Sequence, residues 1–253
     1  MMEEGDKYFF VSDVHLGAVG DTEGAREKAF LKFLKSLPEG TRGLFFLGDI
    51  FDFWVEYRDV APRGFVRVLG ELARLADRGV EMWFFAGNHD YWVFDYLRDE
   101  IGMHIVTDTY RVMEVAGRTV CMGHGDGVGR HSLSTRLIFR FIRSPFWIAV
   151  LKIIHPWFIF RIAHVWSKSS RRKQGKRHYK FRGTDDPIYK FADELGRTRR
   201  IDMYVFGHLH SPAMVDVPSG GRLFILDDWA AGCNYLNLSG MCISGRDLPK
   251  IEK

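Results

Sequence analysis

Five short apolar segments of this chain each lead into a cluster of Asp, His or Asn residues, usually beside a glycine. The clusters are Asp13-Val14-His15, Gly48-Asp49, Gly87-Asn88-His89-Asp90, Gly123-His124-Gly125-Asp126 and Gly207-His208-Leu209-His210. Short apolar runs bounded by turn residues are typical of buried strands. In open α/β sheets, ligands bind in the loops beyond the carboxyl ends of the strands. The fold must therefore bring these strand ends to one place.

Strands and helices alternate in the first half of the chain. Strands are predicted for Lys7–Ser12, Gly43–Leu47 and Glu81–Ala86. Helices are predicted for Thr22–Ser36 and Arg63–Asp77, where apolar residues recur at helical spacing. Such alternation predicts right-handed βαβ crossovers and a largely parallel sheet.

The second half of the chain is predicted to contribute antiparallel strands, with a further apolar strand at Ile201–Phe206. The predicted hairpins pair Tyr110–Val115 with Arg118–Met122, Val215–Val217 with Arg222–Leu226, and Tyr235–Leu238 with Met241–Ser244. Two facing sheets with helices outside them would account for the whole chain. The expected fold class is therefore α/β (α+β).

A segment between the two halves, residues 131–182, is both aromatic and basic, and its apolar residues recur at helical spacing. We therefore expect one domain built from residues 1–130 and 183–253, with an inserted helical lid over residues 131–182. The inserted helices either pack on the domain as an apolar hairpin or bind an anionic membrane or a lipid-phosphate substrate. The basic run Lys168–Lys180 is either part of that surface or a solvated loop.

Composition excludes several other classes. The chain has 253 residues, which fits one large domain. Lys and Arg number 36 against 32 Asp and Glu, an excess too small to indicate a nucleic-acid partner. Its 3 cysteines lack CxxC spacing, which excludes a disulfide scaffold and suits a reducing compartment. We expect no signal peptide, and the apolar stretch Pro145–Phe160 is shorter than the about 20 residues that a spanning helix needs.

Converging loops with these residues would supply the ligands of a two-metal site. Two divalent ions about 3.5–4 Å apart require a bridging carboxylate. A mixed set of oxygen and imidazole ligands suits Mn or Fe better than a thiolate site would. Such ions neutralise a phosphate and generate hydroxide from bound water near neutral pH. A single Asp-x-His or Gly-Asp is usually a turn, but the whole ordered set is difficult to explain by packing.

Together, the clusters D-x-H, G-D, G-N-H-D, G-H-G-D and G-H-L-H resemble those of the calcineurin-like metallophosphoesterase superfamily. The resemblance extends from Asp13 to His210 and implies a four-layer αββα sandwich. It also implies that one metal ion is held by Asp13, His15, Asp49 and His210. The second ion would be held by Asn88, His124 and His208, with Asp49 bridging. His89 would be a general acid or an electrostatic clamp at the leaving oxygen, oriented by Asp90.

Within this superfamily, the chain is similar to the UDP-2,3-diacylglucosamine pyrophosphatases of lipid A biosynthesis. The matching segments are Leu47–Trp54, Met122–Asp126, Ser167-Lys168 in the insert and Gly207–Pro212. The resemblance implies water attack on UDP-2,3-diacylglucosamine, giving UMP and 2,3-diacylglucosamine 1-phosphate. It implies two divalent ions, Mn²⁺ before Fe, and a cytoplasmic protein that is peripheral on the inner face of the bacterial inner membrane.

Contacts to the substrate are predicted for Asn88, His208, Lys168, Arg171 and Trp54. The best-known branch of that family carries Arg where this chain has His89, a side chain that can protonate a leaving alkoxide. The alternatives are a phosphodiesterase or phosphatase with a soluble substrate, and a non-catalytic scaffold that binds a partner protein. A nuclease is disfavoured, because the basic residues lie in an apolar insert rather than along an open groove.

Overall fold

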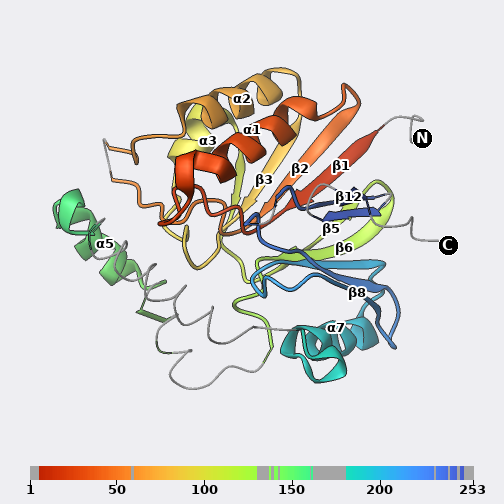
Figure 1. The fold of residues 1–253 in the computed structure, drawn as a ribbon. Coiled ribbons are helices and arrows are strands. Elements are labelled where there is room, and N and C mark those ends of the chain that lie inside the picture. The colour runs from red at the N-terminus through yellow and green to blue at the C-terminus, as the bar shows by residue number, and fades with distance from the viewer. Residues whose placement is uncertain are drawn as a thin grey trace.

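The computed structural model describes residues 6–57, 60–129, 137, 140–141, 143–159, 161, 181–230, 232–238, 240–243 and 246–247. Within these residues the chain forms two facing β-sheets with helices on both outer sides (Figure 1). This arrangement confirms the expected αββα sandwich and the α/β (α+β) class.

The first sheet has its strands in the order β12-β11-β10-β1-β2-β3-β4. Its parallel strands are β1 (Lys7–Val11), β2 (Thr41–Leu47), β3 (Glu81–Phe85) and β4 (His104–Val106). Its antiparallel strands are β10 (Tyr235–Asn237), β11 (Gly240–Ile243) and β12 (Arg246–Asp247). The parallel sheet predicted for the first half is therefore present, and the last predicted hairpin extends it beyond β1.

The second sheet has the order β5-β6-β7-β9-β8. Its strands are β5 (Arg111–Val115), β6 (Arg118–Gly123), β7 (Met203–Phe206), β8 (Ala213–Asp216) and β9 (Arg222–Ile225). The outer pairs are the predicted hairpins, but β6, β7 and β9 run parallel to one another. The prediction that the second half is antiparallel is therefore wrong at the centre of this sheet. Turn residues in the sequence identify hairpins between neighbouring strands. They cannot identify the parallel pairing of β6 with β7, because a long connection separates these two strands in the sequence.

Helices cover the outer faces of both sheets (Figure 1). The helices are α1 (Ala25–Ser36), α2 (Val66–Asp77) and α3 (Tyr96–Ile101) on the first sheet and α7 (Pro187–Thr198) on the second, with 3₁₀ turns at Thr22–Gly24 and Gly183–Asp185. The sequence predicts α1 and α2, but α7, α3 and β4 were missed. The sequence does carry a signal for the start of α7, namely Asp186 followed by Pro187. In the structure, the Asp186 carboxylate caps the helix by accepting a hydrogen bond from Ile188 N at 3.0 Å.

Three apolar interfaces hold the four layers together. Successive side chains of β2 point to opposite faces of the sheet. Leu44 and Phe46 pack toward the helices, while Phe45 and Leu47 pack between the two sheets. Phe10 stacks on Phe45 in the inter-sheet layer, with ring centroids 4.8 Å apart. Fully burying one such side chain contributes about 1.5–3 kcal/mol. Much of the high aromatic content of the chain is therefore core.

The insert contributes helix α5 (Pro145–Ile153), which buries none of its described side chains. It lies apart from the two sheets, on the side toward which β1, β2 and β3 run (Figure 1). Phe146 is 66% exposed and Ile153 is 84% exposed. Helix α5 therefore presents apolar side chains outward, and the helical lid over residues 131–182 stays a prediction. Among the residues that the structure describes, no helix is both long and apolar enough to cross a bilayer.

Candidate metal centre

The candidate ligands come from the loops at the carboxyl ends of five strands. Asp13 and His15 follow β1, Asp49 follows β2, Asn88 follows β3, His124 follows β6, and His208 and His210 follow β7. Because these strands are parallel within each sheet, their ends lie at one edge of the sandwich. The loops are tightly turned, and left-handed φ values occur at Asp13, His15, Asp49, His208 and His210. A left-handed backbone costs a non-glycine residue about 1–2 kcal/mol, and such strain is concentrated at functional sites.

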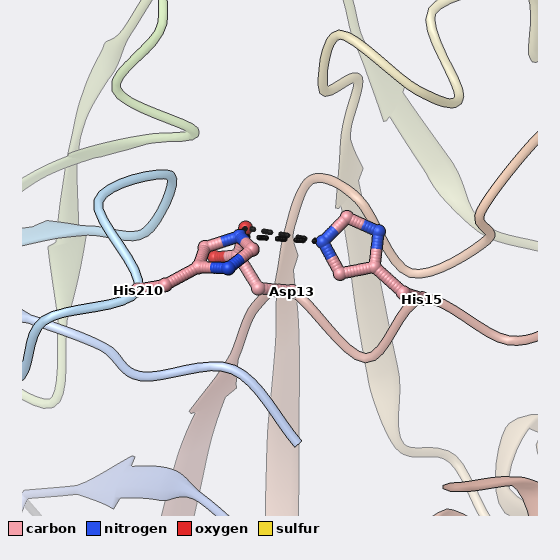
Figure 2. Close-up of side chains that lie close together, drawn as sticks. All are labelled: Asp13, His15 and His210. Atoms are coloured by element: carbon pink, nitrogen blue, oxygen red, sulfur yellow. Dashed lines mark hydrogen bonds and ion pairs between the residues drawn. The ribbon is translucent and has the colours of Figure 1, made fainter. Parts of the chain in front are cut away.

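Asp13, His15 and His210 form the first group of side chains (Figure 2). His210 Nε2 lies 3.0 Å from Asp13 Oδ1 and 3.3 Å from His15 Nε2. Asp13 is fully buried and His15 is 5% exposed. Three metal-ligating atoms therefore converge on one point, as the coordination of a single ion requires.

Asn88, His124 and His208 form the second group. His124 Nε2 lies 3.2 Å from Asn88 Oδ1 and 3.2 Å from His208 Nδ1. Asp49 joins the two groups, because its Oδ2 lies 3.4 Å from His124 Nε2 and 3.9 Å from His15 Nε2. The predicted ligand residues are thus brought together, with Asp49 between the groups, where a bridging carboxylate belongs.

Backbone carbonyls fix the orientation of two imidazoles. His124 Nδ1 donates to Leu47 O at 2.9 Å, which leaves Nε2 to face the second group. His89 Nδ1 donates to Asp52 O at 2.9 Å, which leaves its Nε2 at 4.0 Å from Asp49 Oδ2. A hydrogen bond to one ring nitrogen commonly selects the tautomer in which the other nitrogen can ligate or transfer a proton.

The donor set fits divalent cations. Two buried carboxylates face converging imidazole nitrogens, an arrangement that gathers electron-rich atoms around a point where a cation would neutralise them. Two glycines allow the backbone of neighbouring loops to lie close to these carboxylates. A Cβ at Gly87 would overlap Asp49, and a Cβ at Gly207 would overlap Asp13. Oxygen and nitrogen ligands without thiolate are consistent with the predicted pair of divalent ions.

Burial and neighbouring charges shift the proton affinities of the candidate ligands. Burial lowers the pKa of His15 to about 4, and burial together with the charge of His124 lowers the pKa of His208 to about 4. Burial acts to raise the pKa of Asp49, but the neighbouring imidazoles outweigh it and hold that pKa well below its usual value. His15 and His208 are therefore neutral near pH 7. Burial acts to lower the pKa values of His124 and His210, but the neighbouring Asp49 and Asp13 carboxylates outweigh it and raise them, so a metal ion bound there would displace a proton.

Asp90 does not orient His89. Its carboxylate instead accepts hydrogen bonds from the backbone N–H groups of Asp49, Ile50, Phe51 and Gly87. It therefore fastens the loop after β3 to the loop after β2. The residue beside the His89 ring is Asp52, with its Oδ1 3.8 Å from His89 Nδ1 and 3.7 Å from His15 Nδ1. In the sequence, Asp52 could have been recognised as a second carboxylate three positions after Asp49.

Trp54 does not line the site, contrary to its prediction as a substrate contact. It is fully buried, and its Nε1 donates to Glu56 Oε1 at 2.8 Å. The Glu56 carboxylate also accepts from the backbone N–H groups at the start of α3, so Trp54 belongs to the packing that holds this helix. Lys168 and Arg171, the other two predicted contacts from the insert, lie outside the described residues.

Comparison with known proteins identifies the class. Residues 7–212 match the family model described as calcineurin-like phosphoesterase. The chain belongs to this family, which confirms the predicted metal-dependent phosphoester hydrolase.

The most informative relatives share one name. The chain is 35% identical to the UDP-2,3-diacylglucosamine hydrolase of Porphyromonas gingivalis, over 97% of this chain and 99% of that protein. It is 26% identical to the enzyme of the same name from Shewanella piezotolerans, over 96% of each chain. The counterpart from Aeromonas hydrophila is 29% identical over 87% of this chain and 89% of its own length. The predicted resemblance to this group is confirmed.

We expect Gly87→Ala to expel bound metal, because the added Cβ overlaps the Asp49 side chain and backbone. Metal analysis of the purified variant should show clearly less than the wild-type metal content. Gly70→Ala is the matched control, since Gly70 lies within α2 with open space around it. That change should retain the metal and stabilise the protein by about 0.5–1 kcal/mol. A Gly87→Ala protein with full metal content would contradict the assignment of Asp49.

In metal-free protein, we expect the rings of His15 and His208 to titrate near pH 4. An unfolded histidine takes up its proton near pH 6.5. The stability that these two neutral rings contribute is therefore present above pH 6.5 and is lost as the pH falls toward 4. NMR titration of the assigned ring signals measures this directly, with the urea-unfolded chain as reference. Titration of both rings near pH 6.5 in the folded protein would refute it.

Proposed function

We propose that this protein hydrolyses the pyrophosphate of UDP-2,3-diacylglucosamine to UMP and 2,3-diacylglucosamine 1-phosphate, with two divalent metal ions. The observation that carries the proposal is the position of Asp49 between two groups of metal-ligating side chains. The similarity to hydrolases named for this substrate, over nearly the whole chain, supports the choice of substrate.

Asp13, His15, Asp49 and His210 would hold one ion, and Asp49, Asn88, His124 and His208 the other. Ions so held supply Lewis acidity toward phosphate oxygens and lower the pKa of bound water. We favour Mn²⁺, with Fe as the alternative, because the ligands are oxygen and imidazole nitrogen.

His89 and Asn88 are the residues that would act on the phosphate itself. The Nδ1–H of His89 is held by Asp52 O, and its Nε2 lies 4.0 Å from Asp49 Oδ2, beside the candidate metal centre, where a protonated Nε2 would donate to the leaving oxygen. The Asn88 amide NH₂ can donate to a phosphate oxygen while its Oδ1 faces His124. His208 lies beside the same position and would contact the phosphate as well as the ion.

The insert, residues 131–182, would receive the acyl chains. Arg143 Nη2 donates to Asp126 Oδ2 at 3.2 Å, and its guanidinium lies 5.2 Å from the centre of the Tyr91 ring. Lys152 Nζ lies 4.2 Å from the centre of the Phe94 ring. These contacts attach the described part of the insert to the loops after β6 and β3, next to the candidate metal centre.

Exposed apolar side chains on that part of the insert are suited to acyl chains and to the surface of the membrane. One buried methylene contributes about 0.8 kcal/mol, so ten acyl carbons would contribute roughly 8 kcal/mol that a polar metal site could not supply. We propose that the protein works at the inner face of the bacterial inner membrane as a peripheral protein, with Lys168 and Arg171 of the insert binding phosphate.

Purified protein with Mn²⁺ is expected to convert UDP-2,3-diacylglucosamine to UMP, measured by chromatography of the nucleotide. Asp49→Ala should lower turnover by a factor of about 10³ or more, because it removes the bridging ligand. Asp216→Ala, at an exposed carboxylate on β8, is the control and should retain activity. Release of aryl alcohols from simple phosphodiesters without any attack on the lipid nucleotide would instead establish the soluble-substrate alternative.

Replacing both Phe146 and Ile153 by Ser should raise KM for the diacylated substrate about tenfold or more, since each side chain would bury apolar area against acyl chains. Turnover of bis(p-nitrophenyl) phosphate should not change. Val66→Ser is the matched control, because Val66 is 76% exposed but lies on α2. Co-sedimentation with anionic liposomes should weaken in the double variant only. Wild-type KM and liposome binding in the double variant would refute the assigned role of α5.

A further inference from the structure

Arg26, in the first turn of α1, connects two of the loops that surround the candidate metal centre. Its Nη1 donates to Val14 O at 3.1 Å, and its Nη2 donates to Asp228 Oδ2 at 3.3 Å. The Arg26 side chain is only 14% exposed. Val14 is the residue between Asp13 and His15, so the guanidinium holds the backbone between two candidate ligands.

Asp228 lies at a strand end that the sequence analysis did not assign to the site. β9 runs parallel to β7, so the residues after β9 emerge at the same edge of the second sheet as His208 and His210. Asp228 Oδ2 is 3.7 Å from His210 Nδ1, and its Oδ1 accepts from Ala230 N at 3.2 Å. The carboxylate therefore contacts one ring nitrogen of His210, while the other nitrogen faces Asp13 and His15 (Figure 2).

We infer that Arg26 and Asp228 are positioning residues, which hold His210 against Asp13 and His15 so that the three can share one metal ion. The inference rests on the proposed two-metal site and adds a connection between its first group and α1. Arg26 fixes the loop that carries Asp13 and His15, and Asp228 fixes His210. Because Arg26 also binds Asp228, the two loops are held relative to each other, although they come from different sheets.

This pair differs from the ion pairs on the surface of the molecule. Arg222 and Asp216 approach more closely, with Nε 2.6 Å from Oδ1, but the Asp216 side chain is 75% exposed. Exposed pairs of that kind contribute little. The Asp228 side chain is 21% exposed, and Arg26 divides its donors between a carboxylate and a backbone carbonyl. Residues that do not bind the metal themselves but hydrogen-bond to its ligands typically lower metal affinity by about 10–100-fold when they are replaced.

The test is a calorimetric titration of metal-free protein with Mn²⁺, for wild type, Arg26→Met, Asp228→Asn and the double variant. Two ions should bind to wild type. In each single variant, one of the two dissociation constants should rise about 10–100-fold. In the double variant the loss of binding free energy should be smaller than the sum of the losses in the two single variants, because the two residues also contact each other. The electron paramagnetic resonance signal of the coupled Mn²⁺ pair should weaken in parallel.

Arg222→Met and Asp216→Asn are the matched controls and should bind both ions as wild type does. Melting temperatures of the metal-free variants separate loss of metal affinity from loss of folding. If Arg26→Met folds poorly, Asp228→Asn still tests the inference, because it keeps the size of the side chain. Unchanged dissociation constants in Arg26→Met and Asp228→Asn would overturn the inference while leaving the proposed function intact. A wild-type protein that binds no Mn²⁺ would overturn both.

Discussion

The carboxylate of Asp13 is one of the points at which the two sheets of this molecule are joined at the site. Asp13 follows β1 of the first sheet, and its Oδ2 accepts a hydrogen bond from the backbone N–H of His208, beyond β7 of the second sheet, at 2.9 Å. Its Oδ1 contacts the ring of His210. The close approach requires a glycine at position 207, where a Cβ would overlap Asp13. The inter-sheet core brings the strand ends near each other, and contacts such as those of Asp13 with His208 and His210 fix how ligands from the two sheets meet.

The geometry of the site is held by the fold rather than by the ligands themselves. Five of the candidate ligands have left-handed backbone, which is unfavourable for residues with a side chain. Such a conformation persists only where surrounding contacts determine it. Asp90 supplies contacts of this kind, since its carboxylate ties together the backbones of the loops after β2 and β3. The strained loops at the site are therefore determined by backbone contacts from neighbouring loops, which fix the positions of the candidate ligands.

The candidate ligands could be predicted from sequence because each cluster directly follows a strand that the local pattern reveals. Asp90 and Trp54 were assigned wrongly for a different reason. Both lie next to site residues in the sequence, but the direction of a side chain within a tight loop is decided by tertiary contacts, here with backbone N–H groups and with Glu56. Asp228 was missed because the strand before it was predicted as half of a simple hairpin. Only the parallel pairing of β9 with β7, which joins distant parts of the chain, places it at the ligand edge.

The described aromatic residues fall into two groups that differ in burial. Those on β1 and β2 are buried between layers, as with Phe10 and Phe45. Those on α5 are exposed although the helix is apolar, with Phe146 at 66%. A helix of that composition in a core would bury one face, whereas α5 buries no side chain against the described residues. Acyl chains are the occupant that the proposed substrate would bring. The chemistry and the recognition of lipid would then lie on different elements, and Arg143 would couple them through Asp126, two residues beyond His124.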